Sequence, residues 1–145
     1  MPLSLQSSAW EGDSVARATD NVIGSPIDVL TWDIALGRIR DWAGRRESRV
    51  VCICNVHSVV TARTDVQFAE VLKRADMATP DGAPLAWMLR ALGHRQQRRI
   101  NGPDLMWRFC DEASEASPSI YLYGSSPETC WRRPETEPVL QVVPK

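Results

Sequence analysis

Apolar residues along this chain alternate between short continuous runs and stretches with helical spacing. Residues 49–54 and 119–123 are continuous apolar runs of the kind that forms strands buried on both faces, and a brief third strand is expected at 76–80. The helices expected from the spacing cover residues 31–44, 57–63, 64–72, 84–92 and 103–113. Because strands alternate with helices, the pattern predicts an α/β fold, a Rossmann-like parallel sheet with helices on both faces.

Local signals at the helix ends support these boundaries. Thr31 is a suitable N-cap for the first helix, and Gly44 ends that helix. Thr64 is expected to cap the third helix, while Pro84 and Pro103 suit the first turns of the last two. The order of elements is therefore predicted by local chemistry as well as by periodicity.

The chain divides into three parts by composition. Residues 1–20 are polar and aperiodic and are predicted to form a mobile lead-in, while residues 21–130 carry the alternating elements of one domain. Residues 131–145 hold three prolines and no amphipathic period, so an irregular tail is expected there. Since no further helix or strand is predicted after residue 123, the sheet is expected to be incomplete at its C-terminal end.

Composition and charge exclude several classes of protein. The 145 residues carry a net charge of −1, which argues against nucleic acid binding by bulk charge. No apolar run approaches the ~18 residues of a membrane span, and no secretory signal is recognised, so a cytoplasmic chain is expected. The four cysteines, Cys52, Cys54, Cys110 and Cys130, form no C-x-x-C pair and are expected to be free, buried thiols.

Polar clusters follow the three predicted strands, where ligands bind in open parallel sheets. These clusters are residues 55–58, 79–82 and 124–126. In the second cluster Asp81 is either a helix N-cap or a general base, and Gly82 allows a backbone to approach closely. His57 in the first cluster is either structural or a base or hydroxyl ligand. The third cluster is either an ordinary loop or a turn whose amides and hydroxyls hold a diphosphate.

Two further polar segments leave alternatives open. Residues 94–99 are a basic run, which is a solvated loop, a phosphate clamp or a contact with anionic lipid heads. Asn101 and Asp104 are either part of a helix cap or ligands of sugar hydroxyls. No Asp-x-Asp pair is present, which disfavours a divalent metal held by that device. The lack of G-x-G-x-x-G disfavours a nicotinamide enzyme.

Taken in order, five segments resemble the WecG/TagA/CpsF glycosyltransferases (glycosyltransferase family 26). The likeness covers about residues 22–129, and its most diagnostic stretch is residues 75–84. The segments are Gly24-Ser25-Pro26-Ile27-Asp28, Cys54-Asn55-Val56-His57-Ser58-Val59-Val60-Thr61-Ala62, Ala75-Asp76-Met77-Ala78-Thr79-Pro80-Asp81-Gly82-Ala83-Pro84, Arg99-Ile100-Asn101-Gly102-Pro103-Asp104-Leu105 and Tyr121-Leu122-Tyr123-Gly124-Ser125-Ser126-Pro127-Glu128.

The resemblance implies an inverting enzyme of the hexosyltransferase or N-acetylmannosaminyltransferase type in cell-surface polysaccharide synthesis. It implies a UDP-sugar donor, a polyprenyl-diphosphate-linked acceptor, no metal cofactor and peripheral attachment to the inner face of the cytoplasmic membrane. The aspartate of Thr-Pro-Asp-Gly, Asp81, would be the catalytic base. The substrate-binding candidates are Asn55, His57, Thr79, Gly82, Arg99, Asn101, Gly102, Asp104, Gly124, Ser125 and Ser126.

Two departures from the family pattern bear on activity. Ile53 stands where many members have Thr, so a hydroxyl contact to the sugar is expected from His57 or Ser58 instead. Residues 131–145 resemble nothing that follows the glycine turn in members, which is typical of a truncated chain. The alternative function is therefore a non-catalytic remnant that at most binds nucleotide. The sequence leaves open which sugar and which acceptor are used and whether the chain forms a homo-oligomer.

Overall fold

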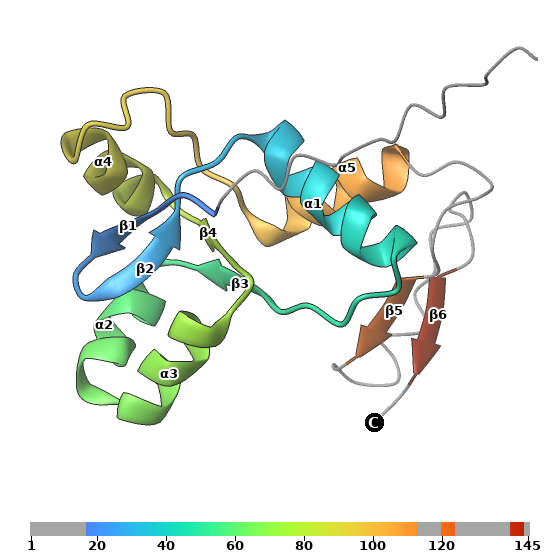
Figure 1. Ribbon diagram of the computed structural model, residues 1–145, viewed down its shortest axis with the longest axis horizontal. Helices are drawn as coiled ribbons and strands as arrows, with labels where there is room; N and C mark the ends of the chain where they lie inside the picture. Colours follow the sequence, from blue (N-terminus) through green and yellow to red (C-terminus); the bar gives the residue numbers. More distant parts are fainter. Residues whose placement is uncertain (1–16, 113–119, 124–139, 144–145) are drawn as a thin grey trace, which may run out of the picture.

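In the computed structural model, which describes residues 17–112, 120–123 and 140–143, helices and strands alternate along the chain (Figure 1). The strands are β1 (Thr19–Val22), β2 (Ser25–Asp28), β3 (Val51–Cys54), β4 (Met77–Pro80), β5 (Ile120–Tyr123) and β6 (Leu140–Val143). The helices are α1 (Trp32–Gly44), α2 (Val56–Thr64), α3 (Val66–Arg74), α4 (Ala83–Ala91) and α5 (Gly102–Asp111). The α/β class predicted from the sequence is confirmed.

The central sheet is a parallel pair of strands, β3 and β4. Their register places Val51 opposite Met77 and Cys54 opposite Pro80. Alternate residues of the two strands point to opposite faces, as a strand requires. Cys54 and Ala78 belong to one buried cluster, and Met77 belongs to a second cluster on the other face. The pair is thus a fragment of a Rossmann-like sheet with a core on each side.

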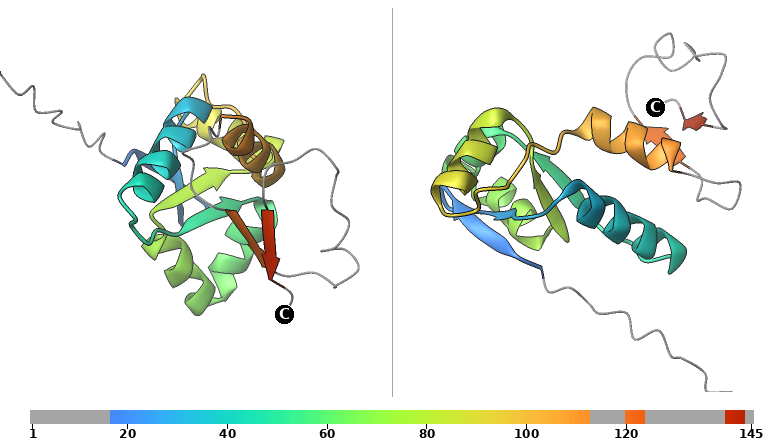
Figure 2. Two further views of the ribbon diagram at one scale, coloured as in Figure 1. Left: turned by 90° about the vertical axis from the view of Figure 1, so that its right-hand side faces the viewer. Right: turned by 90° about the horizontal axis from the view of Figure 1, so that it is seen from above.

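Helices cover both faces of this pair, as predicted (Figure 2). On one face, Val59 of α2, Leu72 of α3 and Leu85 of α4 share a core. On the opposite face, α1 and α5 contribute Leu36 and Leu105 to the second core. Each helix buries only one stripe, because its outer positions face water. The β3–β4 pair is therefore the layer between two sets of helices.

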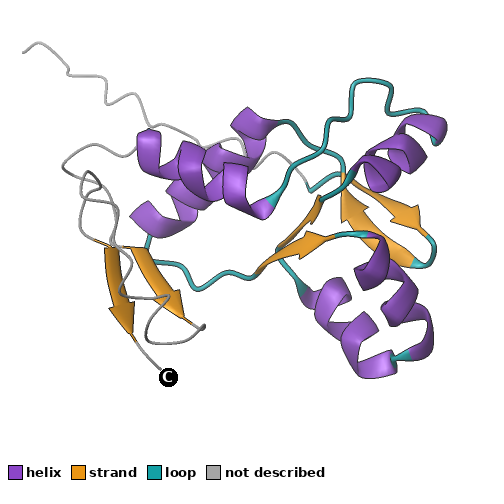
Figure 3. Ribbon diagram, turned by 180° about the vertical axis from the view of Figure 1, so that it is seen from behind, coloured by secondary structure: helices purple, strands orange, loops and turns teal. Residues whose placement is uncertain are grey.

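A β-hairpin that the sequence pattern missed lies beside β4 (Figure 3). Strands β1 and β2 pair antiparallel, so Thr19 and Asp20 belong to a strand and not to the predicted mobile lead-in. The turn residues Ile23 and Gly24 have φ of 52° and 88°, the left-handed values that two-residue hairpin turns use. The turn is short, since Ser25 and Pro26 already belong to β2. The two short strands mix polar and apolar residues, so they lack the continuous apolar run that predicted β3.

The strand predicted at residues 119–123 is observed as β5, but within the described residues it does not join the central sheet. It pairs in parallel with β6, which lies in the segment expected to be irregular. That expectation was wrong for Leu140–Val143, in which three of the four residues are apolar and which lies between Pro138 and Pro144. The prolines stand outside the strand, so they do not remove a donor from its hydrogen-bond ladder.

The buried carboxylate of Asp28 joins several segments of the chain. Asp28, the last residue of β2, has no exposed area. Its Oδ2 accepts a hydrogen bond of 2.7 Å from the backbone N–H of Ala78 in β4. Arg17 donates to both oxygens, with the closest contact at 2.9 Å, and Arg38 of α1 donates to Oδ1 at 3.4 Å. One carboxylate thus ties the hairpin, the central sheet and α1 together.

The helix boundaries agree with the local signals except at one cap. Thr31 caps α1, accepting from the N–H of Ile34. The predicted cap Thr64 is wrong, because Asp65 accepts from the N–H of Phe68 at 3.0 Å and begins α3. Thr64 instead ends α2 and donates its hydroxyl proton to the carbonyl of Thr61. A carboxylate one residue further on is the stronger acceptor for these N–H groups.

Three of the cysteines are free thiols, as expected. Cys54 is buried, and Cys52 and Cys110 are half-buried. Burial raises the pKa of the Cys54 thiol to about 12, which leaves it protonated and unreactive at neutral pH. Cys130 lies outside the described residues.

Replacing Asp28 with Asn is expected to lower the free energy of unfolding by about 3 kcal/mol, because two guanidinium groups lose their buried partner. The amide keeps the shape of the side chain, so the loss measures charge rather than volume. Urea denaturation followed by circular dichroism would measure it. Asp41→Asn, on the exposed side of α1, is the matched control and is expected to change little. Equal stability of the Asp28 variant and its parent would contradict the prediction.

Asp76 is expected to make stability fall in acid. The N–H of Val50 and then the Arg49 guanidinium hold the pKa of Asp76 below its ordinary value of 3.8. A lowered folded pKa stabilises the protein above pH 3.8, and the effect is lost as the pH falls through the folded pKa. Asp76→Asn should therefore destabilise the protein at pH 7, by less than about 1 kcal/mol at this partly exposed site. The difference between variant and parent in urea should disappear near pH 2; a difference independent of pH would argue against this origin.

Candidate active site

Three chain segments meet where β3 and β4 end. The N–H of Asp81 donates to the carbonyl of Cys54 at 2.7 Å, and the N–H of Ile100 donates to the carbonyl of Pro80 at 2.9 Å. These bonds place residues 54–55, 80–82 and 99–101 side by side. The polar rim, as we call this edge, consists of Asn55, Asp81, Gly82, Arg99 and Asn101. The first two predicted clusters therefore do share one edge, and the segment around Arg99 joins them.

Asp81 presents a carboxylate at the rim. The side chain is half-buried, and in the described part of the chain its carboxylate makes no hydrogen bond or ion pair. The N-cap of α4 is Gly82, with φ of 93° and no side-chain cap bond. The interpretation of Asp81 as a helix cap is therefore wrong. Its oxygens remain available to accept a proton or a hydrogen bond from a bound molecule.

Two asparagines begin helices at the rim and hold their amides in defined positions. Asn55 caps α2 in a capping box, with Oδ1 accepting from the N–H of Ser58 at 3.0 Å. Asn101 caps α5, with Oδ1 accepting from the N–H of Asp104 at 2.9 Å. The cap interpretation of Asn101 is confirmed. Since each cap uses only the oxygen, the Nδ2 groups keep their two N–H donors for other partners.

Thr79 lies beneath the rim. Its side chain has no exposed area, and Oγ1 has no hydrogen-bond partner among the residues that the structure describes. The residue opposite it on β3 is Ile53, which offers no polar atom. The structure thus places Thr79 under the site, where its hydroxyl is out of reach of a molecule on the surface. A buried hydroxyl without a partner costs free energy, so this position departs from good packing.

The remaining substrate-binding candidates differ in their exposure and position. His57 is exposed in the first turn of α2, and Asp104 is exposed in the first turn of α5. Arg99 is exposed at the rim, next to Asn101. Gly102 packs against β3, since a Cβ there would lie 3.6 Å from Cγ1 of Ile53. Gly124, Ser125 and Ser126 lie outside the described residues.

The electrostatics of the rim come from helix ends. Helices α2, α4 and α5 all begin at this edge, at residues 56, 83 and 102. Their N-terminal N–H groups and dipoles favour negative charge. The N–H groups of α4 are the most open, because Gly82 supplies no side-chain cap. The rim therefore combines a carboxylate, amide donors and a field that attracts anions.

Among residues 17–112, 120–123 and 140–143, no three His, Cys, Asp or Glu side chains gather as a metal site. Over the same residues, no helix is long and apolar enough to cross a bilayer. The expectation of metal-independent chemistry remains a prediction.

A pocket lined by several arginines, none of them a rim residue, was not predicted from the sequence. It brings together Arg90, Arg98 and Arg108 with Trp32. Arg95, which also lines the pocket, and Arg98 belong to the basic run singled out in the sequence, whereas Arg90 and Arg108 lie outside it. Their meeting depends on how α1, α4 and α5 pack.

A mixed α/β fold with a polar edge at its strand ends is a common frame for ligand binding, and comparison with known families identifies the class of protein. The glycosyl transferase WecG/TagA/CpsF family matches residues 20–136. The chain therefore belongs to the WecG/TagA/CpsF glycosyltransferases, whose function is glycosyl transfer in cell-surface polysaccharide synthesis. No significant match was found among curated proteins.

Replacing Thr79 with Val is expected to raise the free energy of unfolding by about 1 kcal/mol, because a methyl group takes the place of a buried, unpartnered hydroxyl. Thermal and urea denaturation would measure the gain. Thr61→Val, at a half-exposed position of α2, is the control and should change stability less. A loss of stability in the Thr79 variant would show that its hydroxyl is hydrogen-bonded in the folded protein.

Proposed function

We propose that the polar rim is the active site of an inverting glycosyltransferase, with Asp81 as its general base. The donor is a UDP-sugar, and the acceptor is a hydroxyl group of a polyprenyl-diphosphate-linked sugar at the inner face of the cytoplasmic membrane. The main support for the proposal is the environment of the Asp81 carboxylate. Its carboxylate is unpaired among the described residues and lies at a strand end between two fixed amides.

The reaction needs one bond made and one broken at the anomeric carbon. The acceptor oxygen forms a bond to that carbon from the side opposite the UDP, and the bond from the carbon to the diphosphate oxygen breaks. The electron pair of the breaking bond leaves with UDP. The proton of the acceptor hydroxyl passes to a carboxylate oxygen of Asp81. Attack from the opposite side inverts the configuration of the sugar.

The groups around Asp81 complement the charges that develop during the transfer reaction. The departing diphosphate gains negative charge, which the N-termini of α2, α4 and α5 and the guanidinium of Arg99 would stabilise.

The two asparagines would orient the substrates. Asn55 and Asn101 are held by their caps, so their free N–H groups have little rotational freedom to lose on binding. Such donors fit the hydroxyl oxygens of a sugar. His57, exposed two residues after Asn55, is a further hydroxyl ligand in this proposal. The site thus has a base, positive charge for the leaving group and hydroxyl ligands on neighbouring segments.

Asp81→Asn should lower kcat by about 10²–10⁴-fold, because the amide cannot take the acceptor proton. The KM for the donor should change little, since the side chain keeps its size. Transfer from a radiolabelled UDP-sugar to a lipid-linked acceptor in detergent would measure both constants. Asp41→Asn removes the same charge on α1 and is the control.

Unchanged turnover in the Asp81 variant, at saturating substrate, would rule out Asp81 as the base. A parent chain that binds UDP but turns over no donor would instead agree with the non-catalytic alternative. Circular dichroism of each variant would show that differences in rate do not arise from unfolding.

A further inference from the structure

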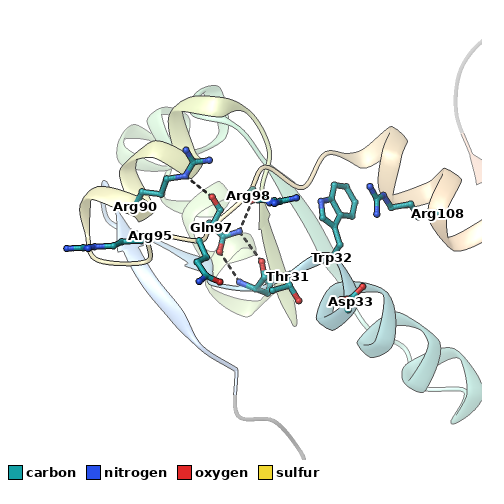
Figure 4. A pocket seen from close by; sticks show the side chains of 10 residues that line it. Thr31, Trp32, Asp33, Arg90, Arg95, Gln97, Arg98 and Arg108 are labelled. Atoms are coloured by element: carbon teal, nitrogen blue, oxygen red, sulfur yellow. Dashed lines mark hydrogen bonds between the residues drawn. The ribbon is translucent and has the colours of Figure 1, made fainter.

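A pocket of about 650 Å³ lies at the N-terminus of α1, beside the loop that joins α4 to α5 (Figure 4). None of the rim residues lines it. Its polar and aromatic lining includes Thr31, Trp32, Arg90, Arg95, Arg98 and Arg108, and we call it the arginine pocket. Its volume falls within the range of pockets that bind small molecules.

Positive charge dominates the arginine pocket. Four arginines line it, against the single carboxylate of Asp33, in a chain whose net charge is −1. The guanidinium groups of Arg95 and Arg98 make no hydrogen bond or ion pair with any residue that the structure describes. Repulsion between nearby guanidinium groups is unfavourable unless an anion neutralises them. The pocket therefore concentrates positive charge, and the guanidinium groups of Arg95 and Arg98 have no anionic partner among the described residues.

The loop that carries Arg95 and Arg98 is held in place along its length. His94 bonds to Asp20 of the hairpin at 2.8 Å, and the N–H of Ile100 bonds to Pro80 at the other end. In the middle, the buried amide of Gln97 accepts from the N–H of Leu30 and donates to its carbonyl, both at 3.0 Å. These bonds fix the loop before any ligand arrives, which reduces the entropy lost on binding.

The remaining two arginines form the walls. Arg90 donates through Nε to the carbonyl of Gln97 at 2.8 Å, so its terminal nitrogens stay available. Arg108 lies over the Trp32 ring, 4.5 Å from the ring centre. Stacking of this kind orients a guanidinium group while leaving its edge free to donate hydrogen bonds. The pocket thus presents fixed, planar donors of the geometry that suits phosphate oxygens.

We propose that the arginine pocket is a second ligand site, separate from the polar rim, and that it takes a diphosphate group. Four arginines line the pocket. Several guanidinium groups suit an anion with adjacent phosphates better than a single carboxylate, since a diphosphate has more oxygens that can accept from separate donors. The choice of source rests on the proposed function, in which the donor nucleotide and the lipid-linked acceptor both carry a diphosphate.

The test is titration of the whole chain with inorganic pyrophosphate, followed by calorimetry at low salt. Saturable binding is expected, and the double variant Arg95→Gln/Arg98→Gln should weaken it by about tenfold or more. Arg46→Gln/Arg63→Gln removes the same charge from exposed positions outside the pocket and should leave binding nearly unchanged. Trp32→Phe, read by tryptophan fluorescence, should abolish most of the emission change on binding and so locate the ligand.

Two further ligands distinguish the sources of the diphosphate. UDP that binds more tightly than pyrophosphate, with the same dependence on Arg95 and Arg98, would assign the pocket to the nucleotide. Farnesyl diphosphate that behaves in this way would assign it to the acceptor lipid. Either result supports the proposal.

Absence of saturable binding would overturn the proposal, and so would equal weakening in the pocket and control double variants. Pyrophosphate binding in the arginine pocket should not depend on the proposed general base. The Asp81→Asn variant should therefore bind pyrophosphate as the parent does. Unchanged turnover in the Asp81 variant, with saturable pyrophosphate binding to the parent, would contradict the proposed function alone. Absence of pyrophosphate binding to the parent, with turnover lost in the Asp81 variant, would contradict the pocket proposal alone.

Discussion

The position of β4, and of Asp81 directly after it, depends on the buried carboxylate of Asp28. That carboxylate accepts from the N–H of Ala78, three residues before Asp81, while Arg17 and Arg38 neutralise its charge. A buried carboxylate is tolerated only when it is paired and hydrogen-bonded, so the hairpin, α1 and β4 must be in place together. The alignment of the rim therefore results from a polar contact in the interior as well as from apolar packing.

Helix caps connect the stability of this fold with the chemistry of its edge. Asn55 and Asn101 complete the first turns of α2 and α5 with their oxygens and retain their amide N–H groups. At α4 the cap is Gly82, and the carboxylate of Asp81 beside it is left without a partner in the described residues. The position with the weakest cap is thus the one where a free carboxylate and open helix N–H groups meet.

The local elements were largely predictable, because each depends on neighbours in sequence. Periodicity and caps predicted the helix from Thr31 to Gly44 and the strands at β3 and β4. The β1–β2 hairpin was missed because its short strands mix polar and apolar residues, unlike the continuous apolar run of β3. Strand β6 was missed because prolines surround it. At Thr64 two adjacent residues were both able to cap a helix, and only the folded backbone selects Asp65.

By itself the sequence determined the alternation of strands and helices, the polar residues at the strand ends and the likeness to a glycosyltransferase family. The tertiary structure decided which of those residues meet. It freed Asp81 from capping, buried Thr79, and gathered Arg90, Arg98 and Arg108 around Trp32 from three parts of the chain. The physical reason is range: caps and periodicity act within one helical turn, whereas burial and charge clustering depend on packing between segments far apart in sequence.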